Sequence, residues 1–151
     1  MREATEQDLD KIVTLGKVFF QETQYSKIGT EYDFDTIMST CKKMITEPSG
    51  VIFVEEDTQS GALLGMAACM TYTLYLNARH LTGSELFWYV IPVARHNGIG
   101  HKLLEGIENW ARNKGCDSLS MVTLRPGDPA AKLYERAGYT LSEVHYLKGL
   151  K

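Results

Sequence analysis

The stretch PVARHNGIGHKLL, Pro92 to Leu104, places an arginine, two glycines one residue apart and a helix-like run directly after an apolar segment. A strand, a glycine turn and a helix start together can bind an anion, because the first helical N–H groups lack intrahelical partners and carry the positive end of the helix dipole. Gly98 and Gly100 have no side chain to keep a phosphate from the backbone. An isolated Gly-x-Gly of this kind is equally compatible with a tight turn that holds no ligand.

Two nucleotide-binding folds do not fit this turn. A dinucleotide fold requires GxGxxG directly after the first strand, whereas position 103 is leucine and the turn lies late in the chain. A nucleotide P-loop requires Gly-Lys-Ser/Thr, whereas Gly100 is followed by His101 and Lys102. The sequence therefore excludes both.

The composition is that of an ordinary globular protein, with 44% hydrophobic and 23% charged residues. A chain of 151 residues fits one domain, which we expect to span residues 1–151. We expect no membrane partner, since no apolar run is long enough to span a bilayer. Cys41, Cys69 and Cys116 form no CxxC pair and have no histidine at zinc-ligand spacing, and no signal-peptide pattern follows Met1. These features predict reduced thiols, no metal and a cytoplasmic location.

The charge pattern restricts the class of partner. A net charge of −3 argues against general nucleic-acid binding, which requires a basic surface. Residues 1–80 carry 7 basic and 12 acidic side chains, whereas residues 81–151 carry 9 and 7. If the second half binds a polyanionic cofactor, the acidic first half favours a cationic substrate.

Hydrophobic periodicity and turn residues define the order of elements. A first helix is predicted from Thr5, with Asp8 helping to cap it, and a second over 35–45. Three strands follow over 51–57, 62–76 and 84–91. The remaining elements are a helix from Gly100 to Gly115, a strand over 118–124, a helix over 128–139 and a last strand over 141–147. The strand over 84–91 has bulky apolar residues on both faces and ends at Pro92, which predicts a position near the middle of a sheet. The expected fold is a mixed α/β (α+β) domain built on one sheet.

Three motifs in order resemble the GNAT acetyltransferase superfamily. Residues 90–103 read V-x-P-x-x-R-x-x-G-x-G-x-x-L, similar to the family's acetyl-CoA-binding motif. REATEQDLDKIVTL resembles its opening strand and helix, and AAKLYERAGY resembles its helix with a tyrosine before a Gly-aromatic pair. The likeness covers nearly the whole chain except residues 22–34 and 61–83. It implies a single-domain mixed sheet, splayed at the central strands and flanked by helices, with acetyl-CoA as co-substrate in the cleft and no metal.

The resemblance also implies which residues contact acetyl-CoA. The pyrophosphate would rest on backbone N–H groups from Arg95 to Gly100, and the pantetheine arm would pair like an extra strand with the backbone around residues 90–93. The implied cofactor-binding residues are Val90, Ile91, Val93, Arg95, His96, Asn97, Gly98, Ile99, Gly100 and Lys102. Arg95 either adds charge or braces the loop, and Lys102 either approaches a phosphate or is a solvated helix-start residue.

Acetyl transfer to an amine requires a neutral amine, stabilisation of the oxyanion and a proton for the departing thiolate. The resemblance implies that a backbone N–H of residues 89–91 donates to the thioester oxygen. It also implies that Tyr134 matches the family's tyrosine that protonates the departing thiolate. On the sequence alone, a packed aromatic on the helix face is the favoured interpretation of Tyr134, and the motif match reverses that preference. Glu85 is the candidate general base, although it lies roughly 13–20 Å before the expected thioester position and would need a water relay. A surface role for Glu85 stays open, as do Glu22 and Glu31 as other bases.

The predicted function is acetyl-CoA-dependent N-acyl transfer to a primary amine by direct attack in a ternary complex. Gly127 departs from the family, which often carries a cofactor-contacting asparagine there, and Asp128 beside it is a candidate helix cap. This departure keeps open a coenzyme A-binding module with weak or no turnover. The acceptor is a small-molecule or peptide amine, with amino acids, protein lysines and N-termini all open, and both a monomer and a homodimer remain possible.

Overall fold

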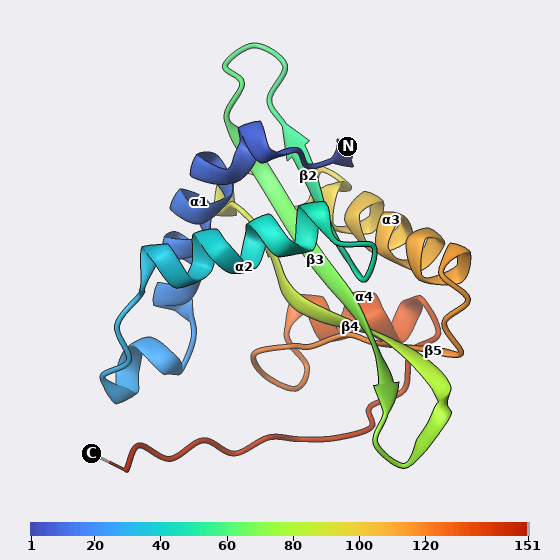
Figure 1. The fold of residues 1–151 in the computed structure, drawn as a ribbon. Helices are drawn as coiled ribbons and strands as arrows, with labels where there is room; N and C mark the ends of the chain where they lie inside the picture. The colour runs from blue at the N-terminus through green and yellow to red at the C-terminus, as the bar shows by residue number, and fades with distance from the viewer. Residues whose placement is uncertain (151) are drawn as a thin grey trace.

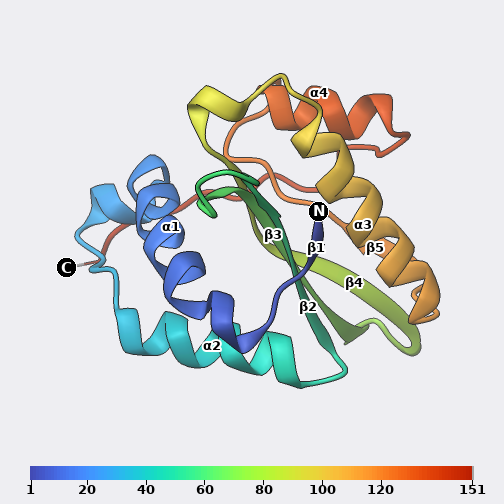
Figure 2. The same cartoon turned by 90° about the horizontal axis from the view of Figure 1, so that it is seen from above.

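The computed structural model describes residues 1–150 as one five-stranded mixed sheet with helices on both faces (Figures 1 and 2). The strands lie in the order β1-β2-β3-β4-β5, antiparallel from β1 to β4 and parallel between β4 and β5. The strands are β1 (Arg2–Glu3), β2 (Gly50–Glu56), β3 (Leu63–Leu74), β4 (Asn77–Val90) and β5 (Ser118–Ser120). The helices are α1 (Leu9–Glu22), α2 (Phe34–Thr46), α3 (Ile99–Asn113) and α4 (Pro129–Arg136), with 3-10 turns η1 (Glu6–Asp8), η2 (Tyr25–Ile28) and η3 (Pro92–Ala94). The expected mixed α/β fold is confirmed.

The sheet is buried on both faces. Ile52 and Val54 of β2 pack in the core beneath α1 and α2, whereas Val51 and Phe53 pack beneath α3. Successive side chains of a strand point to opposite faces, so a strand covered on both sides reads as a continuous apolar run. Figure 2 shows α1 and α2 on one side of the sheet and α3 and α4 on the other.

The N-terminal cap forms as the sequence predicts. The buried Asp8 carboxylate accepts the Thr5 backbone N–H at 2.8 Å and both Arg2 guanidinium nitrogens at 2.7 and 2.8 Å. The Arg2 guanidinium holds the pKa of Asp8 well below its usual range. This contact fixes the start of the first helix beside β1.

The sheet opens beside the second half of β4. β4 and β5 pair only from Thr82–Ser118 to Ser84–Ser120, after which β4 continues to Val90 without β5 (Figure 1). The expected splay at the central strands therefore lies directly before the glycine turn. None of the helices within residues 1–150 is long and apolar enough to cross a membrane.

Three expected strands differ in the structure. β4 begins at Asn77 rather than residue 84, because a tight turn pairs its first half with β3, and β5 ends at Ser120 because the strands part there. The predicted last strand over 141–147 is wrong, since these residues form no strand and are exposed. Leu141, Val144 and Leu147 recur every three residues, and that spacing cannot keep them on one face of a strand with a period of two.

Candidate active site

A β-bulge in β4 orients the site. Ala68 of β3 pairs with Phe87, but the next residue, Cys69, pairs with Glu85, so Leu86 is an extra residue. Phe87 packs against the core beneath α1 and α2, and Leu86 lines a hollow beside α2, so both face the same side. The bulge thereby turns Glu85 to the opposite face, toward α3 and α4.

Glu85 and Tyr134, the two predicted catalytic residues, are in contact. Glu85 Oε2 accepts the Tyr134 hydroxyl at 3.1 Å and the Val122 backbone N–H at 2.9 Å. The Tyr134 oxygen also lies 3.2 Å from the Val122 carbonyl oxygen. The last backbone pair between β4 and β5 is Ser84–Ser120, so Val122 lies beyond the paired part of β5. Its N–H is bonded by the Glu85 carboxylate instead of by a strand backbone.

Burial decides the electrostatics of this pair. Glu85 is 9% exposed and Tyr134 is 5% exposed, so a surface role for Glu85 is wrong. Burial raises the pKa of Glu85 to about 7, although the hydrogen bonds from Val122 and Tyr134 act in the opposite direction. Burial and then the Glu85 charge raise the pKa of Tyr134 above its usual value. A carboxyl group that titrates near neutrality can take up and release a proton at working pH.

The end of β4 presents one residue's backbone to the opening. The Ile91 N–H donates to the Leu64 carbonyl of β3, so the alternation of an antiparallel ladder turns the Val90 backbone away from β3. The Ile91 carbonyl accepts the Ala94 N–H, which leaves neither Ile91 group available to pair with an extra strand. Of the expected pairing residues, Val90 therefore turns its backbone toward the opening, and pairing at Val93 stays a prediction.

The glycine turn leads into α3 with its first N–H groups unbonded within the helix. The first helical bond runs from Lys102 N–H to Gly98 C=O at 3.1 Å, so the preceding N–H groups of the first turn have no intrahelical acceptor. His96 and Gly98 have φ of +73° and +77°, a conformation that glycine adopts without strain and that is uncommon in other residues. Asn97 is exposed, whereas the Ile99 side chain is buried. The turn therefore presents backbone to solvent while Ile99 anchors it.

Glycine is required at positions 98 and 100 for different reasons. A Cβ built on Gly98 would meet nothing within 4 Å, so the space beside it is open. A Cβ on Gly100 would lie 3.1 Å from Cζ2 of Trp88 and therefore points into the protein. Gly98 allows the turn, and Gly100 allows α3 to approach β4.

The two basic residues of the motif form contacts within the chain. Arg95 Nε donates to the Val90 carbonyl at 2.9 Å, and its guanidinium lies 3.3 Å from Glu22 and over the Tyr89 ring. Arg95 thus braces the loop. Lys102 lies 3.3 Å from Glu55 of β2.

A comparison with models of known protein families assigns this chain to a family. The sequence model of the acetyltransferase (GNAT) family matches residues 17–139. The chain belongs to the GNAT acetyltransferase family.

Individual GNAT relatives agree with that assignment. The chain is 36% identical over 53 residues to aminoglycoside N(6')-acetyltransferase type 1 of Klebsiella aerogenes, a match that covers only 35% of either chain. A predicted acetyltransferase with acetyl-CoA from Clostridium acetobutylicum superposes with a TM-score of 0.74 at 20% identity, covering 97% of this chain and 92% of that one. AAC(6')-Iy in complex with a bisubstrate analogue superposes with a TM-score of 0.70 at 17% identity, covering 97% and 95%. At these identities the two structures establish the fold.

The opening in this GNAT domain fits acetyl-CoA on three observations. The first-turn N–H groups of α3 lack intrahelical acceptors, the Gly98 side of the turn is open, and β4 beyond Glu85 has no β5 partner on its Val90 side. Sequence reasoning did not find the Val122 backbone, which anchors Glu85, because nothing in the sequence marks where β5 separates.

Other predicted groups lie outside this opening. Asp128 accepts the Ala131 N–H at 2.9 Å and caps α4, and Gly127 beside it faces open space. Burial raises the pKa of the Cys41 thiol to about 11 and that of Cys69 to about 12. Glu31 is exposed on the loop between η2 and α2. Within residues 1–150, no three or more His, Cys, Asp or Glu side chains gather closely enough to hold a metal ion.

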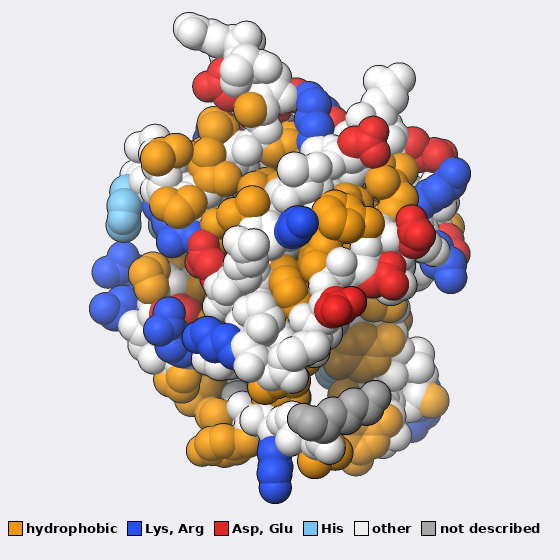
Figure 3. All heavy atoms as spheres, turned by 90° about the vertical axis from the view of Figure 1, so that its left-hand side faces the viewer, with side chains coloured by type: hydrophobic (Ala, Val, Ile, Leu, Met, Phe, Trp, Pro, Cys, Tyr) orange, Lys and Arg blue, Asp and Glu red, His pale blue; other side chains and the backbone are white. Residues whose placement is uncertain are grey.

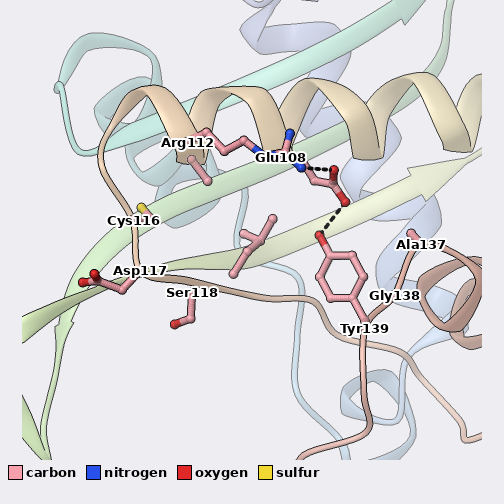
Figure 4. Close-up of a pocket in the computed structure, with 10 residues that line it drawn as sticks. Glu108, Arg112, Cys116, Asp117, Ser118, Ala137, Gly138 and Tyr139 are labelled. Atoms are coloured by element: carbon pink, nitrogen blue, oxygen red, sulfur yellow. Dashed lines mark hydrogen bonds and ion pairs between the residues drawn. The ribbon is translucent and has the colours of Figure 1, made fainter.

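A separate hollow of about 290 Å³ lies beside β5, between α3 and the residues after α4 (Figure 4). The Tyr139 hydroxyl donates to Glu108 at 3.1 Å, and Glu108 also pairs with Arg112 at 2.7 Å. The Tyr139 ring packs against Tyr134, with centroids 5.8 Å apart. This hollow contains none of the predicted cofactor or catalytic residues.

Proposed function

We propose that the protein is an acetyl-CoA-dependent N-acetyltransferase in which a primary amine attacks the thioester directly. The contact between Glu85 and Tyr134, at the point where β4 and β5 separate, carries this proposal. A buried carboxyl that titrates near neutrality, bonded to a phenol, is a proton-transfer pair, and it adjoins the opening expected to hold the thioester.

Each backbone group of the proposed donor site has one task. The first-turn N–H groups of α3 and the Gly98 turn hold the pyrophosphate. The Val90 N–H, which points away from β3, donates to the oxygen of the thioester carbonyl as negative charge develops there. Bound acetyl-CoA supplies the activated acetyl group.

The proton balance runs through the two side chains. As the amine nitrogen forms its bond to the acetyl carbon and the C–S bond breaks, Glu85 takes the proton lost by the amine through a water relay. Tyr134 donates its proton to the departing sulfur and regains one from Glu85 across their 3.1 Å contact. The products are the amide and the free thiol of coenzyme A, and both residues return to their starting states.

We propose a cationic small-molecule amine as the acceptor. The first 80 residues carry an excess of five acidic side chains over basic ones, and one similar protein is an aminoglycoside N(6')-acetyltransferase. Figure 3 views the end of the molecule with α1 and the C-terminus, where charges of both signs are interspersed with hydrophobic side chains. This surface has no continuous acidic area, so we propose that a single carboxylate contacts the acceptor amine. That carboxylate is Glu22, which lies at the end of α1 with its oxygen 2.7 Å from the Tyr89 hydroxyl.

A thiol-release assay with acetyl-CoA and a panel of aminoglycosides, polyamines, amino acids and lysine peptides tests the proposal. We expect saturable release with cationic small amines. Saturable acetyl-CoA binding without thiol release from any amine would instead support a coenzyme A-binding module. Absence of acetyl-CoA binding would overturn both functions.

A further inference from the structure

One buried donor near the first turn of α3 lacks a partner. The indole Nε1 of Trp88 is buried and has no hydrogen-bond partner among residues 1–150. Within residues 1–150, one other buried side-chain atom has no hydrogen-bond partner, Glu55 Oε2, and it faces the N-terminal ammonium group. Because buried N–H groups in folded proteins nearly always have an acceptor, Trp88 Nε1 indicates a bound group from outside the chain.

The position of the indole identifies where that group would lie. Cζ2 of Trp88, which one ring carbon separates from Nε1, lies 3.1 Å from the position of a Cβ on Gly100 in the first turn of α3. The indole also packs against Tyr134, with ring centroids 5.3 Å apart. The indole that carries the unbonded N–H thus lies near both the start of α3 and the proposed proton donor, on the face that the β4 bulge gives to Glu85.

We propose that Trp88 Nε1 donates a hydrogen bond to an oxygen of bound acetyl-CoA. This inference rests on the proposed function and adds a side-chain donor to a site otherwise built from backbone. The acceptor is either a pyrophosphate oxygen or an amide carbonyl of the pantetheine arm, and both chemistries match a neutral N–H donor. Trp88 is a binding residue in this proposal and takes no part in proton transfer.

The two tryptophans of the chain provide a matched pair of variants. Trp88→Phe should weaken acetyl-CoA binding, measured by calorimetry, about 10-fold, the effect of losing one hydrogen bond. Trp110→Phe, on the core face of α3, should leave the affinity unchanged. Trp110→Phe also leaves Trp88 as the single tryptophan, whose emission, excited selectively at the red edge of the absorption, should change as acetyl-CoA is added. Unchanged emission at saturating acetyl-CoA would overturn the proposal.

A shape-conserving replacement separates the hydrogen bond from packing. Benzothienylalanine at position 88 keeps the two fused rings but replaces the N–H with sulfur, and it should lose the same affinity as Trp88→Phe. If this variant binds acetyl-CoA as tightly as the wild type, the inference is wrong and the proposed function stands. If the wild type itself does not bind acetyl-CoA, both fail.

Fragments of the ligand identify the acceptor oxygen. Adenosine 3′,5′-bisphosphate carries the phosphate end, and pantetheine carries the amides. Benzothienylalanine should weaken binding of one fragment and spare the other, which assigns the oxygen. Equal binding of both fragments by the wild type and the variant would overturn the proposal.

Discussion

Replacing Glu85 with glutamine should change how the stability of the protein depends on pH. Burial raises the pKa of this carboxyl from 4.5 to about 7. Between these values the native protein holds a proton that the unfolded chain has lost, so the Glu85 contribution to stability is present at low pH and is lost as pH rises through this window. A difference of about 2.5 units at about 1.36 kcal/mol per unit corresponds to about 3 kcal/mol.

Glutamine keeps an oxygen that accepts the Val122 N–H and the Tyr134 hydroxyl but does not titrate. The free energy of unfolding of Glu85→Gln minus that of the wild type should therefore rise by about 3 kcal/mol between pH 4 and pH 8. Urea unfolding followed by circular dichroism measures this difference at each pH. Other groups, such as Asp8, titrate in both proteins and cancel. Exposed Glu31→Gln controls for the loss of a negative charge.

A rise below about 1 kcal/mol would refute the reasoning, because Glu85 would then titrate near its ordinary value and water would reach it. The same titration predicts a kinetic signature. If ionised Glu85 is the base, the wild-type kcat/KM should fall as pH decreases below about 7, and Glu85→Gln should lose that limb together with most of its activity.

Three further changes test separate parts of the structure. Tyr134→Phe should lower turnover at least about 100-fold in the thiol-release assay while calorimetry gives an acetyl-CoA affinity within about 2-fold of wild type, and unchanged turnover would remove Tyr134 from the mechanism. Gly98→Val places a β-branched residue at φ +77°, so acetyl-CoA affinity should fall about 10-fold or more with an unaltered circular dichroism spectrum; normal affinity would contradict the assignment of the turn. Asp8→Asn should lower the free energy of unfolding by about 2 kcal/mol at pH 7, because the lowered pKa of Asp8 contributes stability above its unfolded pKa. This contribution is lost as pH falls, so the variant should lose less stability at pH 2. An equal loss at pH 2 and pH 7 would show that the ion pair with Arg2 contributes nothing.

Much of the fold could be predicted because strong local signals decided it. The apolar stripes of α1, α2 and α3, the stop at Pro92 and the turn at Gly115 place the elements before any tertiary contact is known. The segment over 141–147 has β-forming residues but no consistent face, and its prediction as a strand was wrong. Local propensity indicates that a strand could form, whereas pairing decides whether it does.

The site was predictable in its residues and not in its geometry. Motif positions selected Glu85 and Tyr134, but a regular strand would have pointed Glu85 to the α1 and α2 side, away from Tyr134. One extra residue in the ladder, Leu86, reverses that direction. The bulge depends on register with β3, which no pattern within β4 records. For the same reason, the role of Trp88 was not apparent from the sequence.

The separation of β4 from β5 links the fold to the proposed chemistry at Glu85. Where the strands part, the Val122 N–H has no acceptor on β5's neighbouring strand backbone and is bonded by the Glu85 carboxylate instead. Any residue with a suitable oxygen at position 85 could accept this bond. A carboxyl both accepts this bond and exchanges a proton, and the burial of Glu85 raises its pKa toward neutrality. The structural requirement thus places a proton acceptor of suitable pKa beside the opening, and glutamine at position 85 separates the two roles because it retains the first and abolishes the second.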